Sequence, residues 1–244
     1  MGASGGPNNV GDGLIFTADA LNKQCWQYNT PSSGSCYSLI EPCTGSLIND
    51  VSGSLGPQGS WAFDGTDDYI ELSTVSNMRP SEADLDATGF TVTAWINSDN
   101  NSLYQGVFCN YGANLSTFYG LELNISSTGY LSMHKMDGTG AGAGDRRSAT
   151  SNAQITVNTW AHVTWDFGSA DHNDWKIYKN AVEGSLSLSC TGGALAYSSN
   201  KGAIGINRVS DFDGEIALVR VYNRSLTQAE VTQNYNAQKS RFGL

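Results

Sequence analysis

The stretch FTVTAWI, residues 90–96, decides the fold. Every second residue from Phe90 to Ile96 is apolar, and side chains two apart on a β-strand lie on the same face. The stretch therefore predicts a strand that turns one face towards a hydrophobic core.

Similar short runs occur along most of the chain, separated by the Gly, Asn and Asp residues that favour turns. They are residues 14–18, 61–63, 69–72, 106–110, 119–125, 130–134, 154–157, 160–167, 175–179, 202–206 and 214–222. About a dozen such strands predict an all-β, two-sheet antiparallel sandwich. The tryptophans expected in its core are Trp61, Trp95, Trp160 and Trp165.

One short C-terminal helix is predicted near the end of the chain. Thr227 and Glu230 have the spacing of a capping box, in which each side chain bonds the other residue's backbone amide. Val231 and Tyr235 follow with helical periodicity, and Gly243 marks the end.

The chain of 244 residues predicts a single domain, since sandwiches of roughly 200–250 residues need not split. Residues 1–12 lack apolar surface and predict a flexible N-terminal arm, which leaves residues 13–244 for the domain. Within the domain, residues 22–57 are irregular and predict a long surface excursion with one short strand.

The charge balance excludes two classes of partner. There are 13 basic and 23 acidic residues, a net charge of -10, which repels phosphate backbones and anionic lipid headgroups. The first residues, Met1 to Asn9, have neither a basic start nor an apolar run, so we expect no signal peptide and no membrane anchor.

Five cysteines is an odd number for a disulfide framework. Cys25, Cys36 and Cys43 crowd one segment, whereas Cys109 and Cys190 stand alone. The first three could pair or bind a metal, but their spacing lacks the C-x-x-C knuckle of zinc sites, so unpaired thiols are favoured.

Five segments resemble segments of the laminin-G-like family in their residues, and they follow one another in the same order along the chain. They are Phe63–Ile70 (FDGTDDYI), Phe90–Ile96, Trp160–Thr164 (WAHVT), Phe212–Ile216 (FDGEI) and Val219–Thr227 (VRVYNRSLT). The resemblance covers about residues 13–240 and implies a concanavalin-A-like jelly roll.

Two further positions bear on what the resemblance implies. Many members of the family carry two acidic residues where this chain has Ala217-Leu218, so a ligand or calcium contact made by those acids is not expected here. The closing peptide, Asn234–Leu244, resembles the tails of laminin-G-like proteins in phage genomes, which implies a place on a bacteriophage virion.

The same fold houses retaining glucanases, which need two carboxylates about 5–5.5 Å apart. Alternating acids occur at Glu82-x-Asp84-x-Asp86 and at Asp211-x-Asp213-x-Glu215. The first group predicts a solvated helical turn capped by Ser81. The second contains Gly214 and predicts exposed acids of a turn, so no catalytic residue is assigned.

Metal binding is expected to be absent, with calcium as the alternative. The sequence supplies hard oxygen ligands at Asp64, Asp67, Asp68 and in the loop Asp171–Asp174. The same residue types are ordinary turn formers, and no spacing approaches an EF-hand loop.

The histidines and a glycine-rich stretch also predict no catalysis. His134, His162 and His172 share no motif with a nucleophile, and His162 alternates with apolar residues as a packed strand residue does. Residues 138–144 (GTGAGAG) lack the Gly-Lys-Ser/Thr ending of a phosphate loop and predict a hairpin tip.

Sugar binding needs aromatic side chains that stack on pyranose rings. Six aromatic residues lie in loop-like, polar surroundings and could stack on a sugar or contact a protein: Trp26, Tyr28, Tyr37, Tyr104, Tyr111 and Tyr197. Which of them converge does not follow from the sequence, so the ligand-binding residues stay unassigned.

The predicted function is a non-enzymatic phage virion surface protein, either a capsid decoration or a head-associated structural protein. The alternative is a carbohydrate-binding receptor module of a tail fibre or tail tip, and a glycan hydrolase comes third. The expected partners are other virion proteins, host-surface glycans and further copies of the chain, for which a trimer is one suitable state.

Overall fold

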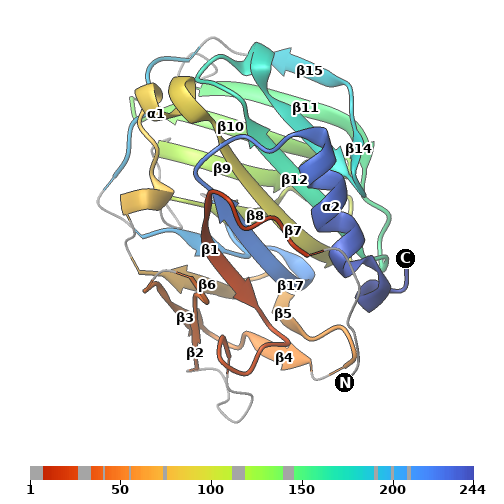
Figure 1. The fold of residues 1–244 in the computed structure, drawn as a ribbon. Coiled ribbons are helices and arrows are strands. Elements are labelled where there is room, and N and C mark those ends of the chain that lie inside the picture. The colour runs from red at the N-terminus through yellow and green to blue at the C-terminus, as the bar shows by residue number, and fades with distance from the viewer. Residues whose placement is uncertain are drawn as a thin grey trace.

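The computed structural model describes residues 8–26, 34–40, 42–54, 56–73, 76–111, 119–139, 146–189, 192–198, 201–207 and 210–244. In them the chain forms two antiparallel sheets packed face to face (Figure 1). The predicted all-β sandwich with a short C-terminal helix is therefore confirmed.

The sheet that we call sheet A has eight strands. Its order is β14 (Val182–Glu183), β13 (Lys176–Lys179), β12 (Ala161–Phe167), β7 (Phe90–Ser98), β17 (Asp213–Tyr222), β5 (Ser60–Asp64) and β4 (Ser52–Ser54), with β1 (Leu14–Asp19) paired to β17. The deciding stretch lies in β7, between β12 and β17, so both of its edges are hydrogen-bonded.

The second sheet, sheet B, has nine strands. Its order is β15 (Leu186–Ser189), β11 (Arg146–Gln154), β10 (Tyr130–Asp137), β9 (Tyr119–Ile125), β8 (Gln105–Cys109), β16 (Ala203–Ile204), β6 (Tyr69–Leu72), β3 (Thr44–Ile48) and β2 (Ser35–Tyr37). Short helices join the strands at η1 (Ser76–Met78), α1 (Glu82–Thr88) and η3 (His172–Asp174).

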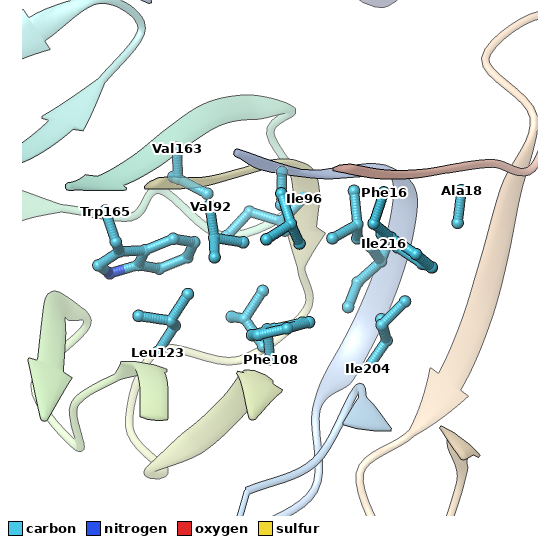
Figure 2. Packing of buried hydrophobic residues seen from close by; sticks show 14 of the residues in the cluster. Phe16, Ala18, Val92, Ile96, Phe108, Leu123, Val163, Trp165, Ile204 and Ile216 are labelled. Atoms are coloured by element: carbon cyan, nitrogen blue, oxygen red, sulfur yellow. The ribbon is translucent and has the colours of Figure 1, made fainter. Parts of the chain in front are cut away.

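The main core lies between the two sheets (Figure 2). Val92, Ile96 and Trp165 of sheet A point towards Phe108 and Leu123 of sheet B, and each of these side chains is at most 1% exposed. Alternation along β7 places its apolar positions in this core, as the sequence predicts.

A second apolar layer covers the outer face of sheet A, where α2 (Gln228–Gln238) and η4 (Lys239–Phe242) lie (Figure 1). Trp95 is fully buried here and not between the sheets, because it alternates with the core positions of β7. The ring of Phe242 stacks on it at 4.0 Å between centroids, and Tyr235 stacks at 5.9 Å.

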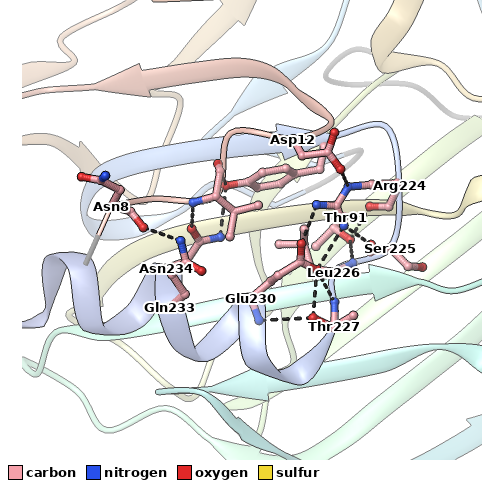
Figure 3. A network of polar contacts seen from close by, with 12 residues as sticks. Asn8, Asp12, Thr91, Arg224, Ser225, Leu226, Thr227, Glu230, Gln233 and Asn234 are labelled. Carbon is pink, nitrogen blue, oxygen red and sulfur yellow. Dashed lines mark hydrogen bonds and ion pairs between the residues drawn. The ribbon is translucent and has the colours of Figure 1, made fainter.

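The predicted capping box starts α2. The Thr227 hydroxyl accepts from the backbone amide of Glu230 at 3.3 Å, and the Glu230 carboxylate accepts from the Thr227 amide at 2.8 Å. The same carboxylate pairs with Arg224 at 2.6 Å, which lowers the pKa of Glu230 to about 2. This network fixes the entry into the C-terminal segment (Figure 3).

The predicted flexible arm is held against α2 over its last residues. The Val10 amide donates to Asn234 Oδ1 at 2.9 Å, and Asp12 lies 2.9 Å from Arg224 Nε (Figure 3). Val10 is only 6% exposed. The part of the arm before Asn8 lies outside the described residues.

Two predicted elements differ from the structure, and two observed strands were not predicted. Residues 154–157 do not form a strand, since β11 ends at Gln154. In its described residues, the excursion of residues 22–57 carries three short strands, β2, β3 and β4, where one is predicted. Two further short strands, β14 and β15, have no counterpart in the predicted set.

Candidate functional site

One row of side chains crosses all nine strands on the face of sheet B that points away from sheet A. The register pairs its members strand by strand, and we call this set the outer row: Ser189, Ser148, His134, Glu122, Cys109, Ala203, Glu71, Ser46 and Ser35. Their chain neighbours Leu121, Leu123 and Met133 face the core, so the outer row owes its position to strand alternation.

A buried acid and a buried imidazole meet in the middle of the outer row. His134 Nδ1 lies 3.1 Å from Glu122 Oε2, and the two residues are 6% and 0% exposed. The Tyr111 hydroxyl donates to the other carboxylate oxygen of Glu122. A carboxylate with two partners is held in one orientation, as a group that positions a ligand must be.

Amides and a second phenol complete the surroundings of His134. The Tyr104 ring lies nearly parallel to the imidazole, at 14° and 6.3 Å between centroids, and its hydroxyl is 3.4 Å from Nδ1. Asn124 Nδ2 is 3.5 Å from the same nitrogen, and Asn207 donates to Asn124 Oδ1 at 2.7 Å.

Asn207 reaches the row because β8 has a glycine at the point of approach. A Cβ atom at Gly106 would meet the Asn207 backbone nitrogen at 2.0 Å, so any other residue would push this segment away. The glycine thus serves the site through backbone packing.

Two hydroxyls beside His134 have no hydrogen-bond partner among the described residues. Ser132 is two residues away on β10, and Ser148 is the direct cross-strand neighbour of His134 on β11. Both side-chain oxygens are buried and unpaired, although the two residues are only 2% and 5% exposed. Buried hydroxyls are normally bonded, so these two keep unused donor and acceptor capacity.

The spacing of acids in the outer row does not fit a glycosidase. Glu122 and Glu71 are three strands apart, roughly 14 Å at about 4.8 Å per strand. Retaining enzymes need about 5–5.5 Å between carboxylates and inverting ones about 6.5–9.5 Å. The row offers groups that bind hydroxyls and lacks the paired acids of that chemistry.

The first predicted acid group lies on a helix, as expected. Glu82, Asp84 and Asp86 belong to α1, and Asp84 forms a capping box with Ser81. Glu82 pairs with the buried Lys135. These contacts give the acids structural roles.

The second acid group differs from its prediction. Glu215 lies inside β17 and not in an exposed turn, and it accepts a hydrogen bond from Ser60 Oγ at 2.6 Å. Asp213 begins the same strand and faces the same side. Asp211 precedes the strand, beside Asp64 and Asp67, where burial and these neighbours raise its pKa to about 6.

The acids predicted as calcium ligands fall into two sets. Asp64, Asp67 and Asp68 converge, with carboxylate oxygens within 4.8 Å of one another. Asp68 accepts from the backbone amides of Asp50 and Asp64, which are turn contacts that need no ion. In the other set, Asp171 bonds the Asn173 amide of its own turn at 3.0 Å.

We expect Asp67→Asn to raise the melting temperature in a chelator by about 1–2 °C, because it removes a negative charge beside Asp68 and Asp211. Differential scanning calorimetry with and without calcium checks this. Asn173→Ala, in the other acidic turn, is the control. A calcium-dependent gain that Asp67→Asn abolishes would contradict the expected absence of a cofactor.

A cavity of about 620 Å³ lies elsewhere, between α1, the start of β1 and the end of β17. Its lining residues are Asp12, Gly13, Asn77, Arg79, Pro80, Asp84, Thr88, Gly89, Phe90, Asn223 and Arg224. Arg224 is paired with Asp12 and Glu230, and Asp84 with Ser81. These charges are bonded within the chain, and we take the outer row as the candidate site because it brings a carboxylate, an imidazole, an amide and an aromatic ring together.

The aromatic candidates separate in the structure. Tyr104 and Tyr111 reach the outer row. Trp26 is buried 6.3 Å from Trp61 and belongs to the core, which contradicts a ligand-binding role. The Tyr197 hydroxyl donates to the Pro80 carbonyl oxygen, and the Arg79 guanidinium lies over its ring. Tyr37 is 49% exposed on an edge strand. Tyr28 lies outside the described residues.

The other histidines lie away from the outer row. His162 is 1% exposed between Trp95 and Tyr235, and burial lowers its pKa to about 3, so the expected packed role is confirmed. His172 lies in η3 against Trp175. The glycine-rich stretch falls mostly outside the described residues.

A family model described as "Concanavalin A-like lectin/glucanases superfamily" matches residues 64–232, more than half of the chain. A search of curated proteins finds no match. In the described residues, no helix is long and apolar enough to cross a membrane.

Solved structures of known proteins share the fold at low identity. The botulinum neurotoxin serotype G binding domain is 13% identical with a TM-score of 0.62, covering 93% of this chain and 51% of its own. The serotype D binding domain is 12% identical with a TM-score of 0.62, at 93% and 52%. A Trypanosoma rangeli sialidase is 13% identical with a TM-score of 0.58, at 94% and 33%. The chain thus spans about half or less of these proteins.

Proposed function

Because the chain belongs to the concanavalin A-like lectin/glucanases superfamily, we propose that it is a lectin-like, non-enzymatic surface protein that binds neutral glycans at the outer row. The net charge of -10 disfavours anionic sugars. Carboxylate, imidazole, amide and hydroxyl groups side by side suit the hydroxyls of a sugar, and Tyr104 supplies an aromatic ring.

The observation that carries this proposal is the pair of hydroxyls at Ser132 and Ser148, which have no partner in the part of the chain that the structure describes. A chain gains nothing in stability from burying a hydroxyl without a partner, which costs about 1–3 kcal/mol. Both hydroxyls flank His134 on the outer face of sheet B, one along β10 and one across on β11, so one polyhydroxylated ligand can bond them together.

Replacing both serines with alanine separates binding from folding. We expect the Ser132→Ala/Ser148→Ala variant to keep or raise the melting temperature, because each change removes an unpaired buried group. We expect its affinity for the best ligand of a neutral-glycan array to fall at least about tenfold, on the order of 1.4 kcal/mol. Isothermal titration calorimetry measures this loss.

The matched control is Val182→Ser, which changes a side chain that is 69% exposed at the edge of sheet A. It should leave affinity unchanged. Unchanged affinity of the double serine variant, or no binding of the parent chain to any neutral glycan, would contradict the proposal.

The non-enzymatic part of the proposal has its own assay. We expect no release of reducing sugar from a bound polysaccharide by the parent chain. Release that Glu122→Gln or Glu215→Gln abolishes would assign a hydrolase instead, with Asp213 and Glu215 sharing one strand face as the pair to examine first.

We also propose that the protein lies on the outside of a phage particle, among other virion proteins. The support is the resemblance of residues 234–244 to phage laminin-G-like tails. Cryo-electron microscopy of the particle tests it: hundreds of copies on the head indicate a capsid decoration, and a few copies at one vertex indicate a tail fibre or tail tip. Absence from purified particles would contradict the placement.

A further inference from the structure

Two cysteines of the excursion between β1 and β5 lie side by side. Trp26 and Cys36 form an isolated antiparallel bridge, and the Tyr37 amide donates to the Cys25 carbonyl at 2.7 Å. Trp26 is the residue directly opposite Cys36, so its chain neighbour Cys25 lies diagonally across from Cys36. A disulfide needs Cα atoms about 4.4–6.8 Å apart, and this adjacent position suits one.

The two side chains also contact each other. The Cys25 and Cys36 thiols are hydrogen-bonded, and both residues are at most 1% exposed. That bond lowers the pKa of Cys25 and raises the pKa of Cys36, so Cys25 ionises first. The Asp19 amide, which donates to Cys25 Sγ at 3.3 Å, favours the same thiolate.

The third cysteine of the segment is bonded elsewhere. Cys43 Sγ lies 3.5 Å from the Ser73 hydroxyl and 3.8 Å from the Ser73 carbonyl oxygen. A metal shared by all three thiols does not fit either. In the described part of the chain, these sulfurs belong to no group of three ligand atoms within 4.8 Å of one another.

We propose that Cys25 and Cys36 form a disulfide that closes the excursion onto the sandwich. This inference does not depend on the proposed glycan binding. With a small disulfide such as oxidised glutathione as oxidant, the Cys25 thiolate attacks one of its sulfurs and releases one reduced glutathione. Cys36 then loses its proton and attacks Cys25 Sγ, releasing the second, so two thiols are oxidised and one disulfide is reduced.

The cross-link would act where the excursion is anchored. Trp26, next to Cys25, packs against Gly53 so closely that a Cβ there would lie 1.4 Å from the Trp26 ring. A disulfide at this point restricts the conformations of the unfolded chain and leaves the native contacts in place. An oxidisable pair also suits a protein used outside cells, where disulfides persist.

Peptide mapping tests the proposal on the full chain refolded with oxidised glutathione. After alkylation at low pH and chymotrypsin digestion, which cuts between all three cysteines of the segment, we expect one linked peptide pair carrying Cys25 and Cys36. The pair should disappear on reduction. We expect the oxidised chain to melt about 5–10 °C above the reduced chain.

Cys36→Ala should abolish this difference between oxidised and reduced chains, whereas Cys43→Ala should keep it. If Cys36→Ala does not fold, the peptide map of the parent chain decides alone. Full alkylation of Cys25 and Cys36 after oxidation, or a linkage through Cys43, would overturn the proposal. Loss of glycan binding in the serine variant bears on neither result.

Discussion

Phe242→Ala is expected to lower the free energy of unfolding by about 3–5 kcal/mol, the range found when a buried Phe is truncated. Phe242 is 5% exposed although it is two residues from the end of the sequence. Its ring stacks on Trp95 at 4.0 Å and 13°, and contacts Trp160 at 4.8 Å. Removing it uncovers the indole of Trp95 and leaves a cavity that the rigid sheet beneath cannot fill.

Urea unfolding followed by tryptophan fluorescence measures this loss, with Leu244→Ala as the control. Leu244 is in the same closing peptide but is 45% exposed, so its truncation should change stability by less than about 0.5 kcal/mol. The comparison also separates two roles of the peptide. If it served only to dock on a particle, Phe242→Ala would leave the isolated protein as stable as the parent.

The sequence does predict on which face of its strand Trp95 lies. The alternation that places Phe90 and Ile96 in the core necessarily turns Trp95 to the other face. A tryptophan at an outward position indicates that something covers that face. The cover comes from η4, about 140 residues later, and only the tertiary structure shows that contact.

The sequence does not predict that Glu122 and His134 meet in the candidate site, and the reason is related. Glu122 and His134 are twelve residues apart and meet only because β9 and β10 pair in one register across a turn with Gly129 at φ 78°. A slip of one residue would turn either side chain into the core. Their one local signal is a polar residue inside an apolar run, Leu121-Glu122-Leu123, which does not say what lies opposite.

The misplaced strand at 154–157 has a packing cause. In β11 the residues that face the core include Ala149 and Ala153, which are small, so the strand has little hydrophobic periodicity. Ile155 and Val157 just beyond it have more, and pattern reading favours them. Hydrophobic periodicity therefore does not predict β11, the strand that contributes Ser148 to the outer row.

We expect Asp166 to make the protein less stable as the pH rises from about 4 to 7, against an opposing contribution from the buried His162. Asp166 lies on the outer face of β12, 3% exposed, where it accepts a hydrogen bond from Thr91 Oγ1 at 2.8 Å. Burial raises its pKa from 3.8 to about 6, against the opposing effect of that hydrogen bond. The folded chain therefore holds a proton on Asp166 that the unfolded chain has already lost in this pH window.

The sign follows from proton linkage, since a group with a raised folded-state pKa stabilises below its unfolded pKa and loses that contribution as the pH passes its folded pKa. A shift of about two units corresponds to at most about 3 kcal/mol between pH 4 and pH 7. Urea unfolding across this range should show the contribution of Asp166 as a difference in slope, because Asp166→Asn, whose amide stays neutral, should gain stability relative to the parent as the pH rises. Asp171→Asn is the control, since the pKa of Asp171 is lowered and its effect lies at more acidic pH. The slope that remains in Asp166→Asn combines a smaller loss from Asp211, which is less buried, with a gain from His162, whose folded-state pKa of about 3 lies below the unfolded value of 6.5. A parent-like slope in Asp166→Asn would show that the carboxyl is already ionised in the folded chain, with Lys176 compensating its burial more strongly than the geometry indicates.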